Sequence, residues 1–247
     1  MGPSLPATPR LAFLSLALLG RVAAAAPVTP APKTADELIA RCLEARGGAA
    51  RLKAVRSVRF SGTLQAGPTT VQMEILKKRP SFFRVRLKAA GAVDGGGFDG
   101  AAWELQDGVP RRVDGAAAQA LKQAAEFDES FVDYRVKGNT VEMAGTRSID
   151  GRDCAALRVR LADGLVREYY FDPETFLVAG DRKIPAPPEA GRLTLRRDYR
   201  RVAGVLVPYA AVEKDLDSGA VTSEVRWDTI EVNVPLEDSA FAPAPVR

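Results

Sequence analysis

Apolar and polar positions follow two different periods along the chain, and the helical period comes first. Thr34 and Glu37 form a capping box, which predicts the start of a helix. The apolar side chains behind it fall on one helical face: Leu38, Ile39, Cys42 and Leu43. Gly47-Gly48 ends this helix, and a second short helix is expected over 49–55.

After this point the period changes from 3.6 to 2. Apolar and polar residues alternate in 58–64, 71–75 and 83–88, which is typical of half-buried antiparallel strands. Asp-Gly pairs such as Asp150-Gly151 are hairpin signals. Further strands are expected at 103–105, about 141, 157–161, 165–171, 176–178, 193–199, 205–212 and 221–234. The pattern therefore predicts about ten or eleven strands.

The middle of the chain interrupts this alternation. Asp114 can cap a helix over 116–125, in which Leu121 is the one large apolar residue. Such a helix packs weakly, which suits a mobile lid that includes the residues up to Phe131. Helices segregated from a long antiparallel sheet indicate an α+β fold, and a sheet of this size must curl. We therefore predict a curled, unclosed antiparallel barrel with an N-terminal helix and a mid-chain helical lid.

The N-terminus has the character of a targeting segment. Arg10 precedes the apolar run 11–20, and 23–26 offers an A-x-A cleavage site. We expect a signal peptide over 1–26, a flexible leader over 27–33 and a single domain over 34–247, located in the periplasm. The alternative is a short anchoring helix, since Arg21 after the apolar run is uncommon in signal peptides.

The amino-acid composition mainly excludes certain kinds of functional site. The 247 residues contain no histidine and two cysteines, which removes Ser-His-Asp and Cys-His nucleophiles and histidine or four-thiolate metal sites. The net charge is +4, but 1–26 holds Arg10, Arg21 and no acid. The remainder thus carries 33 basic and 31 acidic residues, and no basic block with interleaved aromatics indicates nucleic-acid binding.

Several different short motifs follow one another along 34–245. They are Lys78-Arg79-Pro80 with Phe83 and Arg84, Asp99-Gly100 with Trp103, the segment 170–176, Asp198-Tyr199 with Gly204-Val205 and Val207-Pro208, and Phe241 in the tail. Together they resemble the LolA-like proteins, the bacterial outer-membrane lipoprotein-sorting carriers and their relatives. No single motif is specific on its own. The chain also departs from the carriers proper in the glycine run Gly95-Gly96-Gly97 before the Asp99-Gly100 hairpin and in its longer C-terminal half.

The resemblance implies a half-open barrel that holds acyl chains without covalent chemistry, cofactor or metal. It implies lipid or lipidated-protein cargo, membrane donor and acceptor proteins on the inner and outer membranes, and a monomer. It also implies that Arg79 bonds to the lid and controls its opening, since a guanidinium can bond several carbonyls at once. The alternative for Arg79 is a solvated strand end.

Apolar strand faces supply the candidates for the cavity lining. They are Phe60, Leu64, Met73, Ile75, Phe83, Val85, Leu87 and Trp103. The alternative is a closed core, and for Trp103 a structural plug. Cys42 and Cys154 can form a disulfide in an oxidising compartment or remain two buried thiols.

No catalytic residues are predicted. Glu126, Asp128 and Glu129 form an acidic cluster, but in a loop-like stretch with lysine nearby, which is typical of solvated acids. We expect a non-enzymatic carrier. A lipid-sensing regulatory module and a structural envelope protein with a filled barrel are the alternatives.

Overall fold

The computed structural model describes residues 31–89, 92–184 and 191–243. The chain divides into two units, Met1–Ala31 and Pro32–Arg247, and the sheet and its helices belong to the second. The predicted signal peptide and residues 27–30 of the leader lie outside the described residues. Within the described residues, no helix combines the length and apolar character needed to cross a membrane.

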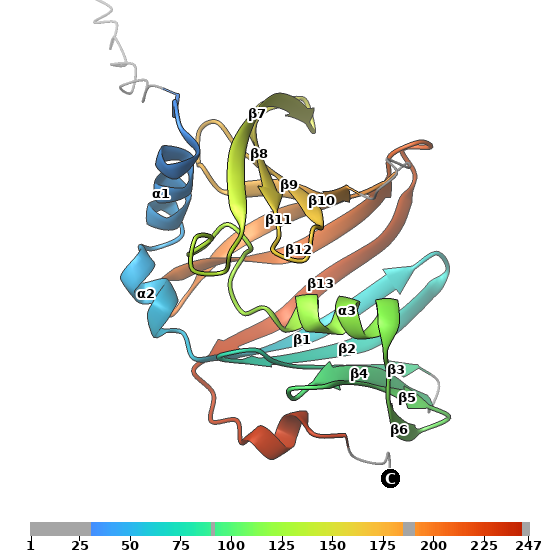
Figure 1. The fold of residues 1–247 in the computed structure, drawn as a ribbon. Coiled ribbons are helices and arrows are strands. Elements are labelled where there is room, and N and C mark those ends of the chain that lie inside the picture. Colours follow the sequence, from blue (N-terminus) through green and yellow to red (C-terminus); the bar gives the residue numbers. More distant parts are fainter. Residues whose placement is uncertain (1–30, 90–91, 185–190, 244–247) are drawn as a thin grey trace, which may run out of the picture. The chain divides into compact units, whose positions relative to one another are not determined.

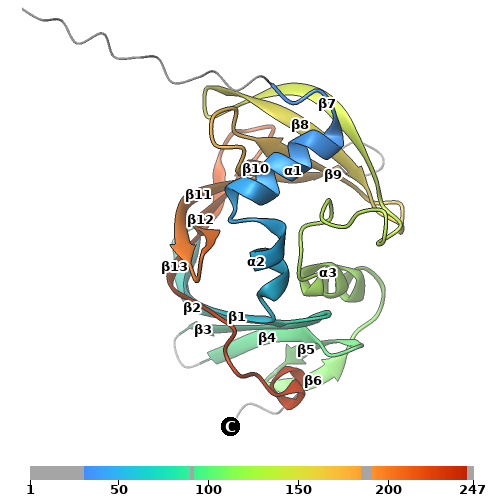
Figure 2. The ribbon, with the colours of Figure 1, turned by 90° about the vertical axis from the view of Figure 1, so that its left-hand side faces the viewer.

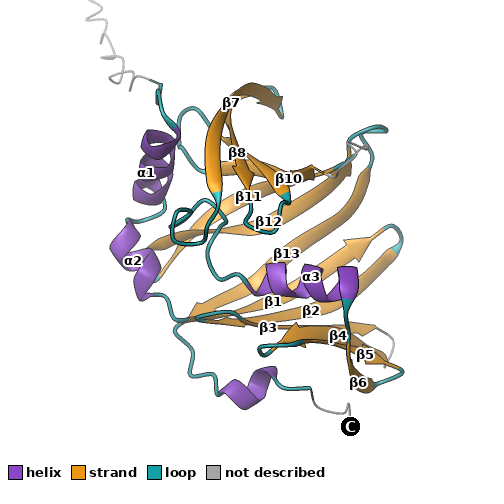
Figure 3. Cartoon of the chain, viewed as in Figure 1, coloured by secondary structure: helices purple, strands orange, loops and turns teal. Residues whose placement is uncertain are grey.

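Thirteen antiparallel strands form one sheet that curls without closing (Figures 1 and 3). Their order is β6-β5-β4-β3-β2-β1-β13-β12-β11-β10-β9-β8-β7, so the two halves of the chain meet where β1 pairs with β13. The strands are β1 (Ser57–Ala66), β2 (Thr69–Lys78), β3 (Phe82–Ala89), β4 (Ala92–Phe98), β5 (Ala102–Gln106), β6 (Val109–Arg112), β7 (Thr140–Ile149), β8 (Arg152–Arg160), β9 (Val166–Phe171), β10 (Val178–Ile184), β11 (Arg192–Val202), β12 (Val205–Asp215) and β13 (Val221–Val232).

The helices are α1 (Ala35–Ala45), α2 (Ala49–Ala54), α3 (Gly115–Ala125) and a terminal 3-10 turn, η1 (Asp238–Phe241). Thr34 caps α1 as predicted, since its Oγ1 accepts from the Glu37 backbone N–H at 3.2 Å. The Glu37 carboxylate accepts from the Lys33 N–H instead of the Thr34 N–H. Asp114 is the N-cap of α3, but its side chain makes no cap bond there, which leaves that end weakly held.

The curled, unclosed α+β architecture confirms the predicted fold class, although the strand count is higher than ten or eleven. The alternation pattern misses β4 because Gly95, Gly96 and Gly97 carry no side chains to alternate. These glycines are required by close packing. A Cβ on Gly97 would lie 2.8 Å from the Trp103 ring, and one on Gly96 would lie 2.9 Å from the Trp103 carbonyl oxygen.

The sheet has an inner face, which carries the three α-helices, and an outer face. Figures 1 and 2 both show α3 inside the curl, with α1 and α2 along one of its open ends. On the inner face, α1 packs its buried Leu38, Ile39 and Cys42 against Leu157 and Tyr169. The C-terminal tail covers part of the outer face, where Phe241 and Leu236 pack on Leu76.

Candidate functional site: a cavity with an apolar wall and a charged end

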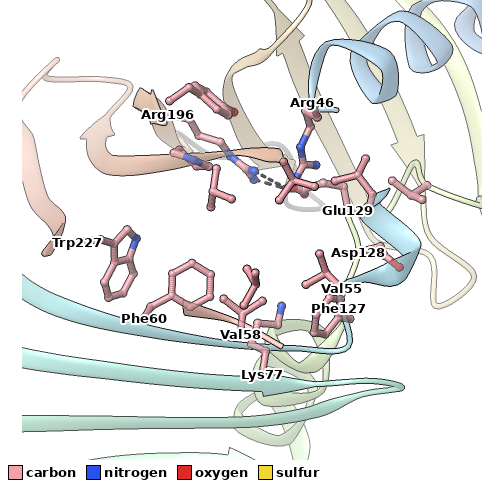
Figure 4. A pocket seen from close by; sticks show the side chains of 17 residues that line it. Arg46, Val55, Val58, Phe60, Lys77, Phe127, Asp128, Glu129, Arg196 and Trp227 are labelled. Carbon is pink, nitrogen blue, oxygen red and sulfur yellow. Dashed lines mark hydrogen bonds and ion pairs between the residues drawn. The ribbon is translucent and has the colours of Figure 1, made fainter. Parts of the chain in front are cut away.

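A cavity of about 220 Å³ lies on the inner face, between the strands near the β1–β13 junction and the segment that follows α3 (Figure 4). Its lining comes from the residues that end α1 and α2, from α2 itself, from β1, β2, β11, β12 and β13, and from residues 127–132. The lining residues are Arg46, Leu52, Val55, Val58, Phe60, Lys77, Phe127, Asp128, Glu129, Val132, Arg196, Tyr199, Val205, Val207, Pro208, Trp227 and Val232. Its volume is below the ~300–1,000 Å³ usual for ligand pockets.

One wall of the cavity is apolar. The rings of Phe60 and Trp227 pack at a tilt of 47° with their centroids 5.1 Å apart, and Val58 lies two residues before Phe60 on the same face of β1. The pairing of β1 with β13 shifts register between Ser61 and Gly62, and Gly62 stands opposite Trp227. A Cβ on Gly62 would lie 2.8 Å from the Trp227 Cα, so glycine permits the close approach of these strands.

The segment 126–130, which follows α3, forms the opposite wall and is held in place by Arg79. The Arg79 guanidinium pairs bidentately with Asp128, at 2.5 and 2.7 Å. It also donates to the Val55 carbonyl at 2.8 Å and the Leu52 carbonyl at 3.3 Å, and it lies over the Phe127 ring at 4.3 Å. One side chain at the end of β2 thus joins α2 to the segment after α3.

The charged end of the cavity centres on a buried ion-pair network. Arg196 of β11 pairs with Glu129, and it donates to Asp181 of β10 at 2.8 Å. Burial alone would raise the pKa of Glu129, but the charges of Arg196, Arg46 and Arg167 and the Arg196 hydrogen bond lower that pKa to about 2. Glu129 is therefore an anion at neutral pH, and its charge is matched mainly by Arg196.

Lys77 brings a second cation to the cavity from β2. Its side chain points to the inner face, beside Val58, and its ammonium donates to the Glu126 carbonyl. Burial lowers the pKa of Lys77 to about 8, even though Glu129, Asp128 and Glu126 oppose that shift. In Figure 4 the amine points from the floor of the cavity toward its interior.

Arg46 contributes the third cation. It is the C-cap of α1, and its backbone is fixed because the carbonyl accepts from the Leu206 N–H at 2.9 Å. Gly47 follows it against the Gly204 carbonyl, where no side chain would fit. The buried Nε of Arg46 has no acceptor, and no ion pair joins its guanidinium to a described carboxylate. Figure 4 shows this guanidinium beside Glu129 and Arg196.

The predicted lining residues are divided between three places. Of the eight candidates, Phe60 lines the described cavity and the other seven do not. Leu64, Met73, Ile75, Phe83, Val85 and Leu87 share the inner face with Phe60, as the pairing of β1, β2 and β3 shows. Trp103 lies on the outer face, where its Nε1 donates to the Phe241 carbonyl at 2.9 Å.

The two cysteines are both buried, free thiols. Cys42 belongs to the inner-face cluster around α1, whereas Cys154 packs with Ala156 and Tyr170 on the other side of the sheet. A bridge between them would have to cross the sheet. Burial raises the pKa of Cys42 to about 12 and that of Cys154 to about 11.

The expectation that Glu126, Asp128 and Glu129 are solvated is wrong for the last two. Asp128 is held by Arg79 and Glu129 lies against Arg196, with only 17% of its side chain exposed. The arginine partners lie 49 and 67 residues away, so nothing local in the sequence pairs them.

The described residues contain no group of three carboxylate or cysteine side chains placed to hold a metal ion. What the cavity offers is an apolar surface of aromatic and branched side chains beside a cluster of cations. This arrangement is suited to non-covalent binding of a molecule with an apolar part.

No family model and no curated protein matches the sequence, but solved structures match the fold. A LolA superfamily protein from Nitrosomonas europaea superposes with a TM-score of 0.59 at 16% identity, covering 85% of this chain and 98% of that one. The chain has a LolA-like fold. The resemblance seen in the short motifs is thereby confirmed at the level of the fold.

Two further structures share the LolA-like fold. A DUF1329 family protein from Desulfovibrio piger has a TM-score of 0.54 at 11% identity, covering 84% of this chain and 96% of that one. A domain from Vibrio parahaemolyticus, described as belonging to an outer membrane lipoprotein-sorting protein, has a TM-score of 0.53 at 11% identity, with 81% and 96% covered.

Proposed function

We propose that this protein is a periplasmic, non-enzymatic carrier that binds acyl chains of lipids or lipidated proteins on the inner face of its sheet. The observation that carries the proposal is the cavity beside Phe60 and Trp227, which is enclosed by the segment after α3. Its position inside a LolA-like fold supports this use, since one similar structure is named for outer-membrane lipoprotein sorting. A cavity of about 220 Å³ argues against a barrel filled by its own side chains.

Uptake of a chain is driven by burial of methylene groups. Each buried methylene contributes about 0.8 kcal/mol, so about six of them contribute roughly 5 kcal/mol before the cost of association. A volume of about 220 Å³ holds only part of a long chain. A longer cargo therefore requires the segment after α3 to move away from the strands.

Arg79 is the proposed gate for that movement. It holds the segment through Asp128 and Phe127 while it is itself anchored to the α2 carbonyls. Breaking the Arg79–Asp128 pair separates the segment from α2 at the cavity. Opening then exposes the apolar wall, and closure returns the guanidinium to its carbonyl partners.

Native mass spectrometry of the protein purified from the periplasm tests the carrier proposal directly. We expect a bound lipid or lipopeptide, and a stripped sample is expected to bind a fluorescent acyl probe with one-to-one stoichiometry. If the protein carries no lipid and binds no probe, the carrier proposal fails and a purely structural role stands. Binding that alters association with a signalling protein would favour the sensing alternative.

The gate has its own test in Arg79→Leu. We expect probe dissociation to become about tenfold faster, because the segment loses its bidentate partner. Lys53→Leu is the matched control, since the Lys53–Asp133 pair also joins α2 to this loop but is half exposed and lies outside the cavity. Equal effects of both variants on dissociation would show that Arg79 has only a structural role.

A further inference from the structure

The cations of the cavity outnumber the carboxylates available to pair with them. Arg46, Lys77 and Arg196 line the cavity, together with Asp128 and Glu129. Asp128 is occupied by Arg79, which approaches from outside the lining, and Glu129 is occupied by Arg196. Among the described residues, Arg46 and Lys77 thus have no carboxylate of their own.

Neither cation has its hydrogen-bonding capacity filled by the described residues. The Arg46 Nε is buried with no acceptor, and the one bond of the Lys77 ammonium is to the Glu126 carbonyl. An unsatisfied buried donor costs about 1–3 kcal/mol, and more when it is charged. An unsatisfied Arg46 Nε and a Lys77 ammonium with one protein acceptor, both at one cavity, offer donors to a ligand that can accept from them.

The fold fixes the backbone of both residues at the cavity independently of any ligand. Arg46 is fixed at the turn between α1 and α2, where Gly47 and Gly48 have positive φ and the backbone pairs with Leu206. Lys77 is fixed by the register of β2 between Val58 and Phe83. Two rigid elements therefore present cations beside the apolar wall, which is the preorganised geometry that favours binding.

We propose that the cavity recognises an anionic amphiphile, whose carboxylate or phosphate head is bound by Arg46 and Lys77 while its chain lies along Val58, Phe60 and Trp227. This inference rests on the proposed function and narrows it to a ligand class. In Figure 4, Phe60 and Trp227 lie toward one end of the cavity, and Arg46 and Lys77 point into it from opposite sides nearer the other end, with Val58 beside Lys77. A carboxylate or phosphate oxygen accepts from both a guanidinium and an ammonium.

The electrostatics of Lys77 agree with this assignment. Its pKa is about 8 because burial outweighs the nearby Glu129, Asp128 and Glu126, and Arg196 adds a repulsive charge. An anionic head at the ammonium would restore the charged form. The Arg46 charge helps to lower the pKa of Glu129, but that carboxylate is already paired with Arg196.

Pairs of ligands, one with an anionic head and one with a neutral head, distinguish recognition of the head from binding of the chain. Stripped full-length protein with a bound fluorescent acyl probe is titrated with dodecanoic acid or dodecanol, and with lysophosphatidic acid or monoacylglycerol, all below their micelle concentrations. We expect each anionic ligand to displace the probe at an at least tenfold lower concentration than its neutral partner. The tighter of the two anionic ligands identifies the source of the head as a carboxylate or a phosphate.

Variants then locate the head. Arg46→Gln and Lys77→Met are each expected to weaken the anionic ligand about tenfold and to leave the neutral ligand within twofold. Lys78→Met is the matched control for Lys77, because it makes the same change one residue later on the outer face. Arg51→Gln, on the exposed side of α2, is the control for Arg46. Both controls should leave all affinities unchanged.

The outcomes distinguish this inference from the proposed function. If the acid and the alcohol displace the probe equally, or if the controls weaken the acid as much as Arg46→Gln and Lys77→Met do, head recognition is refuted while acyl binding stands. If the wild type binds no probe, both proposals fail. If Arg46→Gln does not fold, two measurements still test head recognition. They are the affinities of Lys77→Met and the ratio of acid to alcohol affinity in the wild type.

Discussion

The two faces of β2 carry adjacent lysines that meet very different surroundings. Lys78 points outward, donates to the Leu236 carbonyl at 2.6 Å and pairs with Asp238 at 2.8 Å. Lys77 points inward, where burial lowers its pKa to about 8 and its one bond is to a carbonyl. The outer lysine has a carbonyl and a carboxylate as partners, whereas the inner lysine has a single carbonyl.

The reason lies in what covers each face. The tail from Val234 to Phe241 lies on the outer face and supplies carbonyls to Lys78, Arg84 and Trp103. It also supplies the buried Phe241, whose ring lies 5.3 Å from that of Phe82. The inner face is covered over the cavity by the segment after α3, which Arg79 and Arg196 hold through Asp128 and Glu129. Beyond the cavity, Phe131 packs on Tyr169 and Phe171. The tail thus satisfies the polar groups of the outer face, whereas the inner face keeps a cavity lined by Arg46 and Lys77.

The largest expected effect on stability comes from a substitution on the outer face. Phe241→Ala removes a fully buried ring from the cluster with Leu76 and Leu236, so we expect the free energy of unfolding to fall by about 3–5 kcal/mol. Urea unfolding of the wild type and the variant measures this loss. Phe60→Ala is the inner-face counterpart, and it is expected to cost clearly less because Phe60 borders a cavity. Equal losses would mean that the inner face is packed like the outer one.

Glu129→Gln tests the ion-pair network of the inner face. Arg196 keeps Asp181 but loses one buried partner, so we expect a loss of about 2–4 kcal/mol in the free energy of unfolding at pH 7. Glu142→Gln, in an exposed pair with Arg158, should change it by less than about 1 kcal/mol.

The pH dependence of the same variant gives a second measurement. The pKa of Glu129 is about 2 in the folded protein, because the arginine charges outweigh burial, and about 4.5 in the unfolded chain. A carboxylate with a lowered folded-state pKa stabilises the fold above the unfolded pKa and loses that contribution as pH falls. The stability gap between wild type and Glu129→Gln should therefore shrink between pH 4.5 and 2. A constant gap would contradict the ionised pair.

How much of this contrast the sequence predicts depends on how local its causes are. Alternation in 58–64, 71–75 and 83–88 places the inner and outer side chains correctly, because strand geometry alone decides which face each residue meets. The Thr34 cap was likewise predicted from the local sequence. The short motif drew attention to Arg79, whose pairing with Asp128 is seen and whose control of opening stays a prediction. These features depend on neighbours in the chain or on a short motif.

The parts that could not be predicted depend on distant partners. Nothing near Glu129 reveals that Arg196 will meet it, and nothing near Trp103 reveals that the tail will cover it. Trp103 therefore resembled a lining residue although it lies on the outer face. The glycine strand β4 was missed for a different reason, since its residues are selected by close backbone approach and not by hydrophobicity.

A smaller effect is expected from Lys77→Met, and it depends on pH. The pKa of Lys77 is about 8 in the folded protein and about 10.5 unfolded, because burial penalises its charge. Between these values the unfolded chain binds more protons, so this site makes the wild type more stable as pH rises from 8 to 10.5. Relative to Lys77→Met, the wild type should gain about 2 kcal/mol in unfolding free energy over that range. Lys78→Met should show no such change, and a gain in both would place the effect elsewhere.

The smallest expected effect concerns the two thiols, which the sheet separates. Cys42 packs under α1 on the inner face and Cys154 packs with Ala156 on the outer face, both as free thiols. Because burial raises their pKa values to about 12 and about 11, neither forms the reactive thiolate at pH 8. We expect no alkylation of the native protein, two alkylated sites after denaturation, and no change in Tm on adding reductant. A disulfide closing a loop of this length would contribute up to about 4.7 kcal/mol. A mass deficit of two hydrogens together with a reductant-sensitive Tm would therefore contradict the separation of the two faces.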